Sequence, residues 1–304
     1  MLTGRRRTGI AAAAMTAKLR SILALLGGLV GGCLPPRSMS DGASGNWIGR
    51  WTERIKSPMS LEDSLVYQPR RFPDGDWSLD AGLEEADFES ADGTRLHGWF
   101  ASPEQPNAVV LFLHGTTGNV TYFRNHIRLF NERLNCAVFA FDYRGYGRSR
   151  GRPSESGIVE DARAARSWLA NRCGVPEADV ILVGHSLGGG VAVEVAARDG
   201  ARGLVLWNTF TSLPDVAKRL VPLLPVQTLM RNRLDSWSRI GEYRGPLLQS
   251  HGDADLVIPF EQGERLHAKA NEPKRFVPVH GGGHNDPPSP EFLQALREFL
   301  QPGP

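Results

Sequence analysis

The stretch that decides the fold is Val180-Ile-Leu-Val-Gly-His-Ser-Leu-Gly188, in which a short apolar run leads directly into a Gly-x-Ser-x-Gly motif. This order predicts a strand, a sharp turn and a helix in immediate succession. The turn holds the serine in a strained backbone conformation, and glycines flank it because a Cβ there would collide with the neighbouring strand or helix. We therefore expect Ser186 at the carboxyl end of a buried strand, with its hydroxyl free to react. The alternative is a tight glycine turn that carries an idle serine.

Short, continuous apolar runs recur on both sides of this motif. Runs without polar alternation are typical of strands that are buried on both faces of a parallel sheet. Between them, 120–134 and 158–169 carry apolar residues at spacings of three and four, which predicts helices. Such alternation predicts an α/β fold with a mostly parallel central sheet and helices on both faces. The apolar runs lie at 108–113, 137–141, 180–183, 203–207, 246–250 and 275–279.

Three local features refine this architecture. Two alternating runs within 88–100 meet at Asp92-Gly93, which predicts a β-hairpin. Pro278 lacks a backbone donor inside the last apolar run, so that strand is expected at an edge of the sheet. The long interval after 203–207 contains apolar residues, which predict a small helical insertion at about 210–243 that serves as a lid and acyl-binding wall.

The serine needs partners, because a hydroxyl at its ordinary pKa is a poor nucleophile without a base that a third group orients. The loops after the last two predicted strands supply them in the order Ser, Asp, His. Asp255 is favoured over Asp253 as the acid, because the apolar residues that follow it can fix the loop by packing. His284 is favoured over His280 as the base, because it lies beyond three glycines, whereas His280 is too close to its strand. Ser186, Asp255 and His284 are thus the predicted catalytic residues.

Acyl transfer also requires donors aimed at the oxyanion that develops on the substrate. The backbone N–H of Leu187, directly after the serine, is the first predicted donor. The second is expected in the loop after the strand at 108–113, and we assign it to the backbone N–H of Thr116. His114-Gly115 in the same loop is also consistent with plain turn chemistry.

Five motifs together resemble a known family. They are His114-Gly115, Asp142-Tyr-Arg-Gly-Tyr-Gly-Arg-Ser149, Gly184-His-Ser-Leu-Gly188, His251-Gly252-x-x-Asp255 and Gly283-His-Asn-Asp286. Over about residues 65–300 the chain is similar to the α/β-hydrolase superfamily, and more narrowly to its Bem46-like branch of serine hydrolases, which includes membrane-associated depalmitoylating enzymes. The resemblance implies an α/β-hydrolase fold, ester or thioester substrates with acyl chains, an acyl-enzyme intermediate, no metal and no cofactor. Thr116-Thr117 departs from the family pattern, in which Asn and a small residue are frequent.

Other functional classes fit the sequence less well. Thirty-five basic and 33 acidic residues leave a net charge of +2, which does not indicate a nucleic-acid partner. The glycines of 145–151 miss the dinucleotide-binding spacing, and the three glycines between His280 and His284 argue against the helix that a metal pair needs.

We expect a monomer with a small acyl-ester substrate. Two alternatives stay open: a serine peptidase acting on short peptides, and a noncatalytic, lipid-anchored binding protein.

The N-terminus predicts export. Basic residues precede an apolar stretch at 22–32, which is short for a membrane span and ends at Cys33. Val30-Gly-Gly-Cys33 resembles the lipobox of bacterial lipoproteins, whether translation starts at Met1 or Met15. The expected location is the cell envelope, with the chain held at the membrane surface by the lipid or the apolar segment. The alternative is an N-terminal transmembrane anchor.

The sequence predicts that the chain is divided into three parts. Residues 34–60 are rich in Pro, Ser and Gly and predict a flexible tether. Within 61–82 we expect an extended segment lying across the domain, with the ordered fold beginning near Leu83. The predicted organisation is a signal peptide with lipobox at 1–33, the tether at 34–60 and an α/β-hydrolase domain at 61–304.

Overall fold

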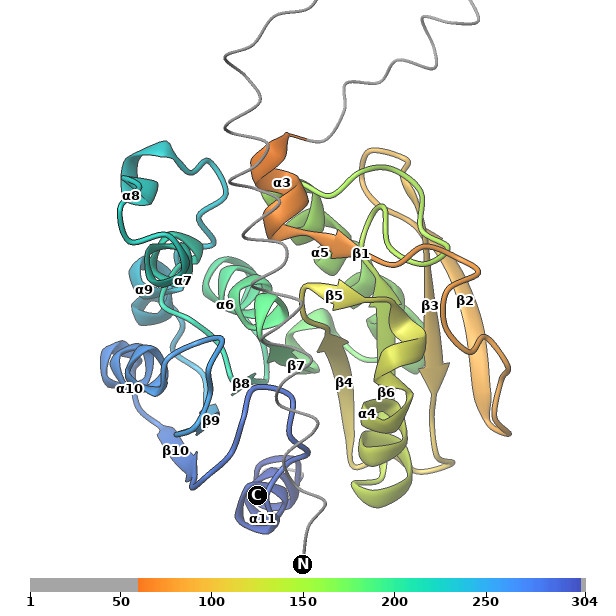
Figure 1. Cartoon of the computed structure of the whole chain (residues 1–304). Helices are drawn as coiled ribbons and strands as arrows, with labels where there is room; N and C mark the ends of the chain where they lie inside the picture. The colour runs from red at the N-terminus through yellow and green to blue at the C-terminus, as the bar shows by residue number, and fades with distance from the viewer. Residues whose placement is uncertain (1–59, 302–304) are drawn as a thin grey trace, which may run out of the picture. The chain divides into compact units, whose positions relative to one another are not determined.

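The computed structural model describes residues 60–301, at whose centre lies an eight-stranded sheet (Figure 1). The strand order is β10-β9-β8-β7-β4-β6-β3-β2, and the six strands from β10 to β6 run parallel, as their continuous apolar runs predict. The strands are β2 (Leu83–Glu89), β3 (Arg95–Ala101), β4 (Ala108–Leu113), β6 (Cys136–Asp142), β7 (Val180–His185), β8 (Gly203–Trp207), β9 (Leu247–Gly252) and β10 (Lys274–Val279).

The two edges of the sheet are the strands that local sequence features single out. β2 and β3 form an antiparallel hairpin in which Glu89 lies opposite Arg95, so the chain turns around Asp92-Gly93. β10, which contains Pro278, lies at the other edge beside β9. Both predictions are confirmed.

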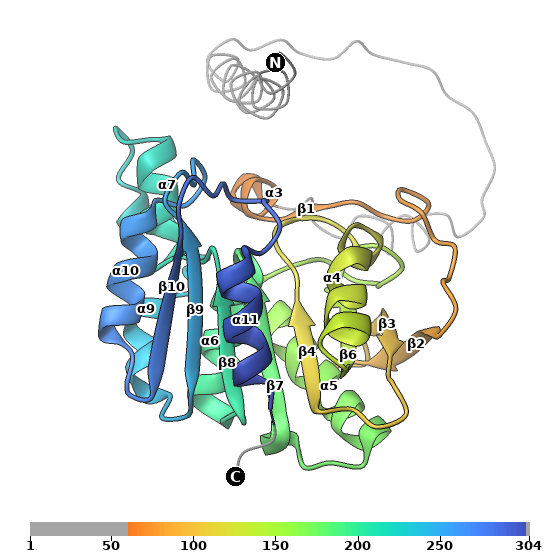
Figure 2. The same ribbon diagram turned by 90° about the horizontal axis from the view of Figure 1, so that it is seen from below.

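Helices cover both faces of the sheet, as predicted (Figure 2). Leu111 and Leu113 of β4 belong to the core of one face, and Val110 and Phe112 belong to the core of the other. The first face carries α5 (Glu155–Cys173), α6 (Leu187–Asp199) and α10 (Phe260–Lys269); the second carries the 3-10 turn η2 (Val120–Phe123), α4 (Arg124–Arg128), the π-helical turn η3 (Leu129–Arg133) and α11 (Pro290–Phe299).

Regular structure begins before β2, earlier in the chain than the sequence indicates. α3 (Leu61–Val66) opens it, and β1 (Gln68–Pro69) pairs in parallel with β5 (Thr117–Gly118). The expectation of an extended segment throughout 61–82 was therefore wrong at its start. The reason is an N-cap: Ser60 Oγ accepts the N–H of Asp63 at 3.0 Å, and acidic residues in the first turn favour the helix.

Residues 210–243 form a helical excursion between β8 and β9, as predicted. It consists of α7 (Leu213–Leu220), α8 (Val226–Leu229), α9 (Ser236–Arg239) and the 3-10 turn η5 (Ile240–Glu242). Leu234 and Ile240 are buried in the same core as α6, which fixes the C-terminal part of the excursion to the sheet.

Membrane attachment is not tested by the described part of the chain. Within residues 60–301, no helix has the length and apolar character needed to cross a bilayer. The predicted signal peptide and lipobox at 1–33, and all of the tether at 34–60 except Ser60, lie outside the described residues.

Candidate active site

Ser186 occupies the turn between β7 and α6, at the carboxyl edge of the sheet. Its φ of 55° and ψ of −118° lie in a region that non-glycine residues rarely adopt. Close packing excludes side chains on both sides of it. A Cβ on Gly184 would lie 2.4 Å from the carbonyl oxygen of Gly188, and a Cβ on Gly188 would lie 2.0 Å from that of Leu113. The strained turn that the motif predicts is therefore present.

His284 and Asp255 reach Ser186 from two other loops at the same edge. His284 Nε2 lies 3.0 Å from Ser186 Oγ, and His284 Nδ1 lies 2.7 Å from Asp255 Oδ2. The carboxylate accepts the Nδ1 proton, so Nε2 is left free to accept the proton of the serine. The structure thus brings the three predicted residues into one hydrogen-bonded row; that they are catalytic stays a prediction.

Asp255 is buried, yet its surroundings favour the ionised form. Burial raises the pKa of its carboxyl, but hydrogen bonds from His251, His284 and the backbone of Ile258 hold that pKa well below its ordinary range. Asp255 Oδ1 accepts the N–H groups of Val257 and Ile258 at 2.8 and 2.9 Å. Ile258 is buried but Val257 is exposed, so backbone hydrogen bonds fix this loop as much as the packing that we expected.

Asp253 and His280, the less favoured candidates for the acid and the base, pair with each other. His280 Nδ1 lies 3.0 Å from Asp253 Oδ2, and the imidazole of His280 is 87% exposed. The N–H of Gly281 donates to the other carboxylate oxygen of Asp253 at 2.7 Å. This surface pair gives His284 and Asp255 a matched control residue each in the same loop.

The loop after β4 places a peptide group beside Ser186. A Cβ on Gly115 would lie 3.3 Å from Ser186 Cβ, so the Gly115–Thr116 peptide lies against the serine. His114 Nδ1 donates to the carbonyl of Gly115 at 2.8 Å, and burial lowers the pKa of that ring, which keeps it neutral. Because the C=O and N–H of a trans peptide point in opposite directions, this bond turns the N–H of Thr116 away from His114. Leu187 is the first residue of α6, where a helix leaves its N–H without an internal acceptor.

Two tyrosines of the motif that begins at Asp142 support the same loop. Tyr146 Oη donates to the carbonyl of Thr116 at 2.8 Å, and Tyr143 Oη donates to the carbonyl of His114 at 3.2 Å. Both tyrosines are buried. The motif therefore fixes the loop to which we assign the second oxyanion donor, and that assignment stays a prediction.

The loop of His284 is held by two side chains to which the sequence motifs give no role. Asn208, directly after β8, donates through Nδ2 to the carbonyl of His284 at 2.8 Å and accepts the N–H of Gly252 through Oδ1 at 3.1 Å. His185 Nε2 donates to the same His284 carbonyl at 3.1 Å. Burial, followed by the nearby His284, lowers the pKa of His185 to about 3, so its ring is neutral. Asn208 thus ties the loop of the base to the strand that leads to the acid. Its position at the carboxyl end of a strand was the signal available in the sequence.

Replacing Asn208 by aspartate is expected to lower kcat by about 10- to 100-fold with little change in KM, because a small misplacement of a catalytic group has costs of that order. The carboxylate keeps the shape of the amide but cannot donate to the His284 carbonyl. The measurement is steady-state hydrolysis of a soluble ester. Asn271→Asp is the control, since Asn271 Nδ2 also donates to two backbone carbonyls, in a distant loop. Equal losses in both variants would contradict a positioning role for Asn208.

A further histidine, His126, is expected to make the fold acid-sensitive. The His126 ring stacks on Phe112 with centroids 5.1 Å apart, and burial lowers its pKa from 6.5 to about 4. The unfolded chain takes up this proton near pH 6.5 and the folded chain only near pH 4, so stability falls as the pH decreases between these values. His126→Phe removes this contribution, and its unfolding temperature should fall less between pH 6.5 and 4. Calorimetry that shows parallel pH profiles for both proteins would refute this explanation.

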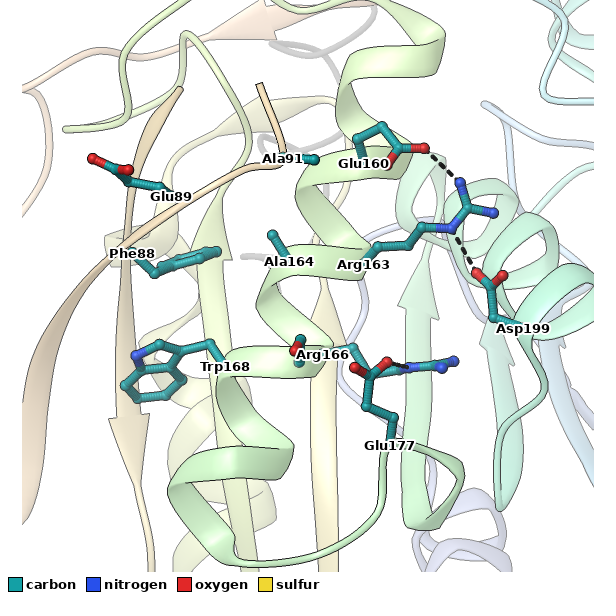
Figure 3. A pocket seen from close by; sticks show the side chains of 11 residues that line it. Phe88, Glu89, Ala91, Glu160, Arg163, Ala164, Arg166, Trp168, Glu177 and Asp199 are labelled. Atoms are coloured by element: carbon teal, nitrogen blue, oxygen red, sulfur yellow. Dashed lines mark hydrogen bonds and ion pairs between the residues drawn. The ribbon is translucent and has the colours of Figure 1, made fainter. Parts of the chain in front are cut away.

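A separate pocket of about 630 Å³ lies along α5 (Figure 3). Phe88 and Trp168 form its apolar part. Arg163 at its rim makes ion pairs with Glu160 and Asp199, each at 2.6 Å. The residues that line this pocket include none of those predicted for catalysis, so it is distinct from the candidate active site.

Three features define an α/β-hydrolase fold. They are the order of the strands in the sheet, the strained turn at the serine, and the placement of all site residues at the carboxyl ends of strands. A model of the alpha/beta hydrolase family matches residues 110–300. The chain therefore belongs to the alpha/beta hydrolase family, and the predicted fold class is confirmed.

Individual relatives agree with this assignment. An uncharacterized protein of Mycobacterium tuberculosis is 38% identical over 248 residues, which cover 79% of this chain and 88% of that protein. The alpha/beta hydrolase domain-containing protein WAV2 of Arabidopsis thaliana is 32% identical over 254 residues, covering 75% of this chain and 82% of its own. Among solved structures, the Pyrococcus furiosus esterase Pf2001 has a TM-score of 0.61 at 18% identity, covering 77% of this chain and 98% of that chain. At that identity the likeness shows the fold.

Proposed function

We propose that this chain hydrolyses carboxylic ester or thioester bonds, with Ser186 as nucleophile, His284 as general base and Asp255 as the acid that orients the base. The observation that carries the proposal is the continuous row of these side chains, with contacts of 3.0 and 2.7 Å. Membership of the alpha/beta hydrolase family supports it, as does the presence of an esterase among proteins of the same fold.

The geometry is suited to acyl transfer in two steps. Ser186 Oγ attacks the substrate carbonyl carbon while its proton passes to His284 Nε2, and the carbonyl electron pair moves to oxygen, where the N–H groups of Thr116 and Leu187 stabilise the charge. Collapse of this intermediate expels the alcohol or thiol, which takes the proton from His284, and leaves an acyl ester on Ser186. A water molecule that gives its proton to His284 then attacks this ester, releases the acid and restores the serine.

The finer parts of the proposal rest on sequence. We place the chain in the Bem46-like branch because of its five motifs, and we propose that residues 1–33 make it a membrane-anchored lipoprotein of the cell envelope. Residues 34–60 would act as the tether, residues 61–304 as a monomeric catalytic domain and residues 210–243 as its lid.

Hydrolysis of p-nitrophenyl esters of increasing acyl length, compared with aminoacyl p-nitroanilides, tests this proposal. We expect short to medium acyl esters to be turned over and the anilides to be poor substrates. Turnover confined to the anilides would replace the esterase by a serine peptidase. Failure to hydrolyse either class, with an unreactive serine, would favour a binding protein that has kept the fold.

A further inference from the structure

An apolar surface lies on the α7–α8 part of the excursion between β8 and β9. Leu223, Leu224 and Leu229 are 96%, 51% and 66% exposed, and Pro222 and Pro225 beside them are exposed as well. We call these five residues the leucine surface. Single exposed leucines are ordinary on protein surfaces, but a cluster of them is typical of a contact with another apolar body.

Basic residues flank the leucine surface along the chain. Lys218 and Arg219 in the last turn of α7, and Arg231 after α8, are exposed. The one acidic residue within 213–233 is Asp215, whose carboxylate already accepts hydrogen bonds from Thr211 and Gln227 at 2.7 and 2.8 Å. A leucine cluster with basic side chains before and after it complements the acyl chains and anionic headgroups of a lipid surface.

The chain that leads to the N-terminus leaves the described domain beside this excursion. Glu62 of α3 accepts the N–H groups of Arg231 and Asn232 at 2.9 and 2.7 Å, so the start of α3 is fixed to the residues that follow α8. The described chain begins one residue before α3. Residues 34–60 span at most about 95 Å even when fully extended, so an anchor at Cys33 would hold the start of α3, which contacts this excursion, within that distance of a bilayer.

We propose that the leucine surface docks on an anionic lipid bilayer, with its leucines at the boundary between headgroups and acyl chains and its basic neighbours beside lipid phosphates. The excursion starts at the carboxyl end of β8, where Asn208 contacts the loop of His284. Docking therefore brings the candidate active site to acyl esters that reside in the membrane. This consequence rests on the proposed hydrolysis of esters; the docking rests on the exposed leucines and the basic residues that flank them.

Hydrogen–deuterium exchange of the full-length protein tests the docking independently of activity. Vesicles of phosphatidylcholine with phosphatidylglycerol are compared with vesicles of phosphatidylcholine alone. We expect amides within 218–231 to exchange severalfold more slowly on the anionic vesicles, and the double variant Leu223→Ser/Leu224→Ser to lose this protection while it still sediments with them. Leu79→Ser is the matched control, because Leu79 is 45% exposed and lies outside the excursion.

These outcomes distinguish a bilayer from another occupant of the leucine surface. They also distinguish failure of the docking from failure of the proposed function. Protection of 218–231 without vesicles that grows with protein concentration would assign the surface to a second copy of the chain. Protection that persists in the double variant, or none on either vesicle, would overturn the proposal. If docking and the proposed function are both correct, the double variant loses a larger fraction of its rate on a vesicle-embedded ester than on a soluble ester. Absence of hydrolysis with either ester, with protection still present, would refute the esterase and leave docking intact.

Discussion

Replacing Ser186 by alanine is expected to lower kcat/KM for p-nitrophenyl esters on the order of 10⁴-fold or more, because the residual rate then depends on the oxyanion donors and substrate binding alone. The fold should persist, since the hydroxyl oxygen contacts His284 Nε2 at the edge of the sheet. Steady-state kinetics and thermal unfolding of the same preparation measure both effects.

Ser289→Ala is the opposite control. Ser289 caps α11 through a hydrogen bond of 3.2 Å from the N–H of Phe292, so its loss should lower the free energy of unfolding by about 1 kcal/mol while leaving turnover intact. If Ser186→Ala instead retained most of the activity, or if both variants lost it together with their stability, Ser186 would not be the nucleophile.

Replacing His284 by alanine is expected to have an effect of the same order, on the order of 10⁴-fold in kcat, because nucleophile and base act as a unit. The buried carboxylate of Asp255 then loses its partner at 2.7 Å. Free imidazole added to this variant should restore part of the rate by entering the vacated space, and it should not restore Ser186→Ala. Kinetics as a function of imidazole concentration measure the rescue.

His280→Ala provides the matched comparison within the same loop. Its imidazole is exposed and paired with Asp253 at the surface, so turnover should stay close to that of the unaltered protein. A large loss in His280→Ala with a small one in His284→Ala would reverse the assignment of the base.

The elements of the fold are predictable from sequence where one local signal dominates. Continuous apolar runs indicate the parallel strands, Asp92-Gly93 indicates the hairpin, and Pro278 indicates the edge strand. Ser186 is placed by its glycine neighbours, since a Cβ at either position would overlap backbone atoms. The order and loop positions of Asp255 and His284 were enough to predict which residues would meet.

Other features depend on contacts between distant parts of the chain and leave no local pattern. Asn208 is an ordinary polar residue in the sequence, yet it joins the loop of the base to the strand that leads to the acid, because three strands end at one edge. The sequence is consistent with plain turn chemistry at His114, but its ring fixes the carbonyl of Gly115, and Tyr146 fixes the carbonyl of Thr116 from a different loop. The helix at the start of 61–82 depends on the capping hydroxyl of Ser60, a signal that the surrounding prolines obscure.

The reaction of the folded protein with a fluorophosphonate, followed by intact-mass and peptide mass spectrometry, tests the central claim most directly. We predict one phosphonyl group per chain, attached to residue 186, and much slower labelling when the imidazole of residue 284 is absent. An unlabelled folded protein, or a label on a different serine, would contradict the account.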